Sequence, residues 1–66
     1  MRVTVNGKPM ELSEGVTVDR LLEHLRISRE YTAVALNREV LAKTAYGDTA
    51  LRDGDKVEIV RPMGGG

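Results

Sequence analysis

The sequence contains no cysteine, no tryptophan and no phenylalanine. Without cysteine the chain can form neither a disulfide framework nor a thiolate metal site, and it has no thiol nucleophile. The missing aromatics leave a core of Val, Leu, Ile and Ala, with Met and Tyr at its edge. The hydrophobic fraction of 41% still suffices for one core and argues against a disordered chain.

The chain also lacks net charge and long apolar segments. Its ten basic and ten acidic residues cancel, and they also cancel within each half of the sequence. There is no basic stripe for a phosphate backbone, so we expect no nucleic-acid partner. No apolar run approaches membrane-spanning length and the N-terminus has no signal-peptide core, so we expect no membrane association and a cytoplasmic location.

The first part of the chain predicts an antiparallel hairpin. Residues 2–5 alternate polar and apolar, and Asn6 and Gly7 follow as a strong turn signal because both tolerate a positive φ. Residues 8–13 should return as the second strand. Pro9 cannot donate to a ladder, so it belongs at the start of that strand or on an exposed edge.

A helix is predicted over residues 18 to about 26, with Thr17 as its N-cap. The apolar residues with the i, i+3, i+4, i+7 spacing of one helix face are Val18, Leu21, Leu22 and Leu25.

Further strands follow the helix. Residues 33–36 predict a strand buried on both faces, Val40 and Leu41 a very short one, and residues 56–60 the last one. Residues 44–51 look irregular, with room for a single helical turn. The pattern therefore predicts an α+β fold, a mixed four- to five-stranded sheet packed on one main helix. We expect the helix crossover to lay the third strand parallel to the first.

No constellation of catalytic or metal-ligating residues is evident, so we expect neither an enzyme nor a metal site. His24 lies on the polar side of the helix and has no second ligand one turn away, which favours a solvated surface residue. Asp53 and Asp55 flank Gly54, and this pattern is typical of a turn rather than of a catalytic pair.

Two residues are candidates for contacts with a partner protein. Val57 and Ile59 should face inward, so Val60 should look out across the open face of the sheet. Tyr46, in the irregular segment, is either a partner-contact residue or a cover for the edge of the core.

The last five residues, 62–66, are Pro-Met-Gly-Gly-Gly and differ in kind from the rest. Glycine costs more backbone entropy to order than any other residue. We therefore expect a folded domain at residues 1–61 and a flexible tail at residues 62–66. A tail without side chains can enter a narrow active site and present the α-carboxylate of Gly66 to another enzyme. The alternative is a loose terminus without a role, and a short run of glycines does not distinguish the two interpretations.

The chain as a whole resembles the ThiS family, the sulfur carrier proteins of bacterial thiamine (thiazole) biosynthesis. The resemblance rests on several segments that occur in register along the whole chain. The extra Gly64 before the usual Gly-Gly is compatible with it. The segments are VTVNG at residues 3–7, VTVDRLL at 16–22, VALN at 34–37 followed by Val40, LRDGDKVEIV at 51–60, and the closing Gly-Gly.

The resemblance implies a ubiquitin-like β-grasp fold and a chemistry performed at the chain end. A ThiF-like adenylating enzyme would use ATP and magnesium to activate the carboxylate of Gly66, while this chain itself would bind no cofactor. Sulfur from a cysteine desulfurase route would then give a thiocarboxylate, and a ThiG-like thiazole synthase would accept that sulfur. Met63, Gly64 and Gly65 would enter the partner's active site.

Other interpretations stay open. The small subunit of molybdopterin synthase is similar in fold, terminus and chemistry but is usually longer by a strand or loop. A ubiquitin-like protein modifier uses the same activated terminus. A β-grasp interaction module without chemistry would be favoured by any natural extension beyond Gly66.

Overall fold

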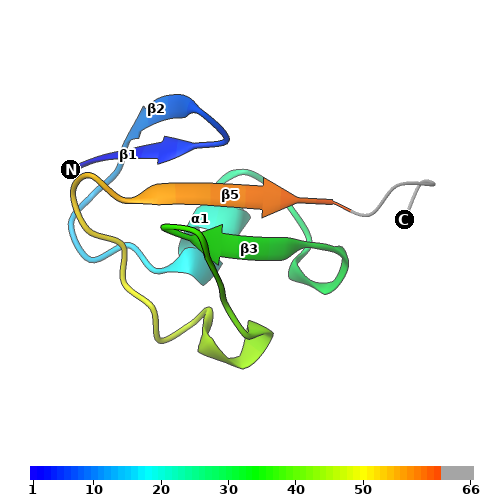
Figure 1. Ribbon diagram of the computed structural model, residues 1–66. Helices are drawn as coiled ribbons and strands as arrows, with labels where there is room; N and C mark the ends of the chain where they lie inside the picture. Colours follow the sequence, from blue (N-terminus) through cyan, green and yellow to red (C-terminus); the bar gives the residue numbers. More distant parts are fainter. Residues whose placement is uncertain (62–66) are drawn as a thin grey trace.

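The computed structural model describes residues 1–61, a mixed sheet with one α-helix packed behind it (Figure 1). The elements, in chain order, are β1 (Arg2–Val5), β2 (Lys8–Glu11), α1 (Val18–His24), η1 (Arg29–Tyr31, a 3-10 turn), β3 (Ala33–Leu36), β4 (Glu39–Val40), η2 (Lys43–Ala45, a second 3-10 turn) and β5 (Lys56–Val60). The predicted hairpin, main helix and last strand are therefore confirmed, and a single helical turn, η2, overlaps the start of the segment predicted to be irregular.

The sheet has the strand order β2-β1-β5-β3-β4, so the last strand lies at its centre. β5 runs parallel to β1 and antiparallel to β3. The prediction that the third strand is parallel to the first is therefore wrong. The helix crossover leaves from β2, which is antiparallel to β1, and a crossover makes the strand that follows it parallel to the strand that precedes it.

Helix α1 begins as predicted, but it ends earlier. The Thr17 side chain accepts a hydrogen bond from the Arg20 amide at 3.2 Å, which satisfies one of the free donors of the first turn. Arg26 has a left-handed φ of 59°. The amide of Ile27, the next residue, donates to the Leu22 carbonyl at 2.9 Å. The helix therefore ends in a Schellman motif, with Arg26 at the position where glycine is usual.

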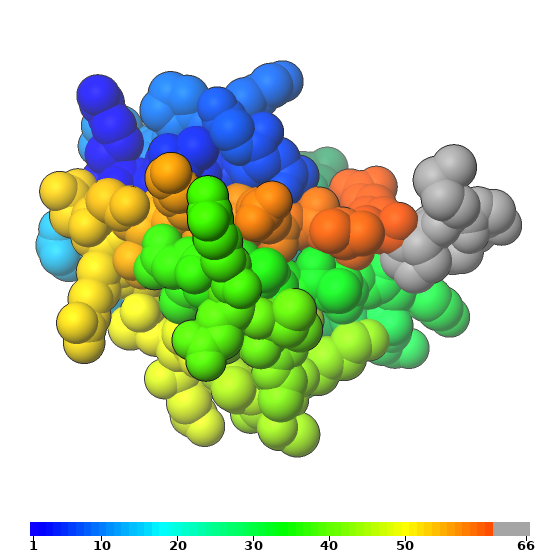
Figure 2. Space-filling view, in the orientation of Figure 1, coloured from blue at the N-terminus to red at the C-terminus, as the bar shows by residue number. Residues whose placement is uncertain are grey.

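The core lies between α1 and the face of the sheet that α1 covers. Val57 and Ile59 point into it, while Val60 is 62% exposed on the open face, both as predicted. Figure 2 shows this open face. The expectation that residues 33–36 are buried on both faces is wrong: Val34 is buried, but Ala33 is exposed and Ala35 only half-buried. The reason is that the helix covers one face only.

Pro9 lies in β2, which is an edge strand of the sheet, as its missing donor requires. Within residues 1–61, no helix combines the length and the apolar composition that crossing a membrane requires.

Candidate functional site

The candidate site is the end of the molecule at which β5 leaves the sheet. Val60 is the last residue of β5 and pairs with Ala33, the first residue of β3. Arg61 follows, exposed, as the last described residue. The sites predicted further along, Met63, Gly64, Gly65 and Gly66, lie outside the described residues.

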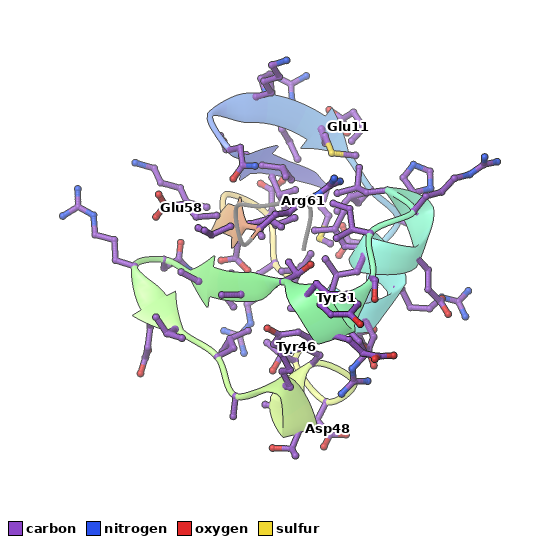
Figure 3. All side chains as sticks on the ribbon, turned by 90° about the vertical axis from the view of Figure 1, so that its right-hand side faces the viewer. Glu11, Tyr31, Tyr46, Asp48, Glu58 and Arg61 are labelled. Carbon is purple, nitrogen blue, oxygen red and sulfur yellow. The ribbon has the colours of Figure 1, made fainter. Side chains whose placement is uncertain are left out.

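A surface depression adjoins Val60. Its volume is about 360 Å³, and its lining residues are Glu30, Tyr31, Thr32, Ala33, Lys43 and Val60. Tyr31 is 57% exposed, so its ring and Val60 give this end of the molecule two large exposed apolar side chains. Figure 3 looks onto this end and labels Tyr31 and Arg61. The pairing of β3 with β5 brings Tyr31 and Val60 together, because Tyr31 ends η1 two residues before Ala33, which pairs with Val60.

Polar contacts hold η1 in place beside this depression. The Arg29 guanidinium donates to Asp19 of α1 at 3.1 Å and to the Lys43 carbonyl of η2 at 2.8 Å. In return the Lys43 ammonium donates to the Glu30 carbonyl at 2.6 Å. The two 3-10 turns and the start of the helix are thus joined, which fixes the backbone that carries Tyr31.

Tyr46 does not belong to this surface. It is 1% exposed, and its ring packs in the core with the Arg29 guanidinium 5.6 Å from the ring centre. The interpretation of Tyr46 as a partner-contact residue is therefore corrected, since a buried ring offers no surface for docking. The alternative, a cover for the edge of the core, understates its burial, because Tyr46 is among the largest fully buried side chains of the core. Tyr31, which the sequence analysis did not single out, is the exposed tyrosine.

The carboxylates of the 53–55 turn have structural partners. Asp53 accepts from the Arg2 amide at 2.7 Å, and Asp55 accepts from the Arg52 amide at 2.8 Å. These bonds agree with the turn interpretation. His24 is exposed, and among residues 1–61 no three His, Asp or Glu side chains are grouped in a way that could hold a metal ion.

Comparison with known proteins identifies the family. The model of the ThiS family matches residues 3–66. The chain belongs to the ThiS family. The structure of a thiamine biosynthesis protein (ThiS) from Geobacter metallireducens superposes with a TM-score of 0.86 and 45% identity, and each chain is covered completely. The ubiquitin-like β-grasp fold expected from the resemblance to ThiS is thereby confirmed.

Curated relatives of this ThiS-family chain are of two lengths. The sulfur carrier protein ThiS of Thermus thermophilus is 42% identical over 64 residues, which are 97% of this chain and 98% of that protein. A thiazole synthase of Paramagnetospirillum magneticum is 39% identical over 66 residues, but the chain spans only 20% of its length. A thiazole synthase of Magnetococcus marinus is matched in the same way, at 35% identity and 20% of its length.

Proposed function

We propose that this chain is a sulfur carrier of thiamine biosynthesis, and that it is a protein substrate of other enzymes rather than an enzyme. The observation that carries the proposal is the family match, which includes the glycine-rich segment and runs to Gly66. The name of the Thermus thermophilus relative, which this chain covers almost completely, also supports it.

The chemistry takes place at the α-carboxylate of Gly66. A carboxylate is a poor electrophile until it has a good leaving group. An adenylating partner of the ThiF kind, which would hold ATP and magnesium, joins a carboxylate oxygen to the α-phosphorus and releases pyrophosphate. A cysteine desulfurase route supplies the sulfur as a protein persulfide, and a thiol reduces that persulfide to hydrosulfide while a disulfide forms. The hydrosulfide then attacks the acyl carbon. The bond from that carbon to the AMP oxygen breaks, AMP leaves, and Gly66 carries a thiocarboxylate.

A thiazole synthase of the ThiG kind is the proposed acceptor of the sulfur. Two thiazole synthases contain a segment similar to this whole chain, which supports a working relation between the two proteins. We also propose a cytoplasmic location, because the chain would act together with these enzymes and their small substrates.

The tail carries the reactive group from the folded body to the partner. Five extended residues span roughly 15–18 Å, so residues 62–66 can reach into an active site next to a docked body. Met63, Gly64 and Gly65 would line that path, and small residues suit a narrow channel.

Transfer of sulfur to the acceptor tests the proposed pathway. The chain is loaded with ³⁴S at Gly66 and incubated with a thiazole synthase and its other substrates. We expect the label to appear in the thiazole as it disappears from the chain. If the chain keeps its label with a synthase that is active on its own carrier, the acceptor lies elsewhere, as in molybdopterin synthesis or protein modification.

The surface beside the tail is the proposed docking site for the adenylating partner. Changing Val60 to Asp puts a charge among the residues that line this depression, Tyr31 included. We expect KM for the carrier to rise about tenfold with kcat little changed, because loss of one central contact costs more than about 1 kcal/mol.

A matched control for Val60→Asp is Val40→Asp. Val40 is 76% exposed and pairs with Ala35, so it lies on the same open face as Val60 but on the edge strand β4. Steady-state adenylation kinetics of the two variants should differ. An equal rise in KM for both, or no rise for Val60→Asp, would argue against docking beside the tail.

A further inference from the structure

Strand β5 extends beyond the end of its neighbour β1. The parallel pairing of the two strands ends at Val5 and Val57. On this side of β5, the Thr4 amide donates to the Asp55 carbonyl and the Asn6 amide donates to the Val57 carbonyl, both at 2.9 Å. The next backbone groups on the same side belong to Ile59, and β1 has by then turned away into the hairpin.

The side chain of Asn6 takes the place of the missing strand. Its Oδ1 accepts a hydrogen bond from the Ile59 amide at 2.8 Å, and its Nδ2 donates to the Ile59 carbonyl at 3.3 Å. One side-chain amide thus supplies the acceptor and the donor that a further residue of β1 would have supplied. Asn6 adopts a left-handed φ of 50°, which asparagine tolerates better than most residues.

The consequence is that β5 is held from both sides up to Ile59. On the other side, β3 pairs with it through Val34 opposite Ile59 and Ala33 opposite Val60. Ile59 lies only two residues before Arg61, after which the tail begins. Without Asn6, the final residues of β5 would be bonded to β3 alone, as the end of an edge strand is.

We propose that Asn6 is a positioning residue for the chemistry of the tail. By pairing with Ile59 it fixes the direction in which the chain leaves the body, and so the place to which a docked body delivers Gly66. This inference rests on the proposed function. It predicts an effect on delivery to the active site rather than on docking, since Asn6 is not among the residues that line the depression beside Val60.

Asn37, in the turn between β3 and β4, provides a control because its side chain also bonds to β5. It also has a left-handed φ, 51°, and its Oδ1 accepts a hydrogen bond from the Lys56 amide at 2.9 Å. Asn37 therefore also accepts a hydrogen bond from a β5 amide, while its Nδ2 donates to the Asp55 carboxylate at 3.0 Å. It acts at the first residue of β5, at the opposite end of the strand from Arg61.

The experiment compares Asn6→Ala with Asn37→Ala in adenylation kinetics. Each variant loses side-chain bonds to β5, so we expect Tm to fall by about 4–8 °C in both. Only Asn6→Ala should lower kcat, by about tenfold at unchanged KM, because a small misplacement of the reacting group slows the chemical step. Equal kcat values for the two variants would overturn the inference. Asn6→Asp, which keeps the acceptor and loses the donor, replaces Asn6→Ala if that variant does not fold.

A second readout separates this inference from the proposed function. NMR order parameters at Val60 and Arg61 should fall in the Asn6 variant and stay at the wild-type value in Asn37→Ala. Unchanged order in the Asn6 variant would overturn the positioning role, whatever the enzyme assay gives. A wild-type chain that a proven adenylating enzyme does not activate would contradict the proposed function, and the NMR comparison would then decide the inference alone.

Discussion

Replacing Gly65 with leucine is expected to lower the rate of sulfur loading at Gly66 by at least about 100-fold. The isobutyl group adds bulk one residue before the reacting carboxylate, and displacement of a reacting atom by about 1 Å can cost this much. Single-turnover loading with the adenylating partner, followed by mass spectrometry, measures the effect.

The fold of the Gly65→Leu variant should remain intact, because the core is built from residues 3–59. Ser13→Leu introduces the same side chain at an exposed position of the body and should load normally. Normal loading of Gly65→Leu would contradict the proposed path of the tail.

Changing Tyr46 to alanine should leave a large fraction of the protein unfolded at 25 °C. Tyr46 is among the largest fully buried side chains, and removing a buried aromatic ring costs about 3–5 kcal/mol. A domain of this size has a total stability of only about 3–5 kcal/mol. Urea denaturation followed by circular dichroism measures the loss.

Tyr31→Ala is the matched comparison for Tyr46→Ala. Tyr31 is 57% exposed, so its removal should change the free energy of unfolding by no more than about 0.5 kcal/mol. Tyr46→Phe keeps the ring and should stay folded. If the midpoint of urea unfolding were the same for Tyr46→Ala and the wild type, the placement of this ring in the core would be wrong.

The parts of the fold that local signals determine could be predicted from the sequence. Three such features depend on only a few neighbouring residues, and the structure has all three. They are the turn at Asn6 and Gly7, the N-cap Thr17, and the inward face of Val57 and Ile59. The end of α1 was missed because Arg26, not a glycine, adopts the left-handed conformation that ends the helix.

The composition of the candidate site depends on contacts between distant parts of the chain. Whether Tyr31 or Tyr46 is exposed follows from the pairing of β3 with β5 and from the bonds of Arg29 to Asp19 and Lys43. No pattern of neighbouring residues in the sequence predicts these contacts. Asn6 was recognised as a turn residue, but its bonds to Ile59 join residues 53 positions apart, and only the sheet topology reveals them.

A sulfur carrier must acquire sulfur at Gly66, and thiol-specific alkylation read by intact mass spectrometry detects that sulfur. The chain is incubated with ATP, magnesium, the adenylating partner and inorganic sulfide, then alkylated, and the adduct is mapped to the C-terminal peptide. Because the chain has no cysteine, a thiol-type adduct must come from newly acquired sulfur. Alkylation also distinguishes it from oxidation of Met63, which adds nearly the same mass as exchange of oxygen for sulfur. We predict one ATP-dependent adduct at Gly66. The absence of an adduct, with a partner that loads its own carrier in parallel, would contradict it.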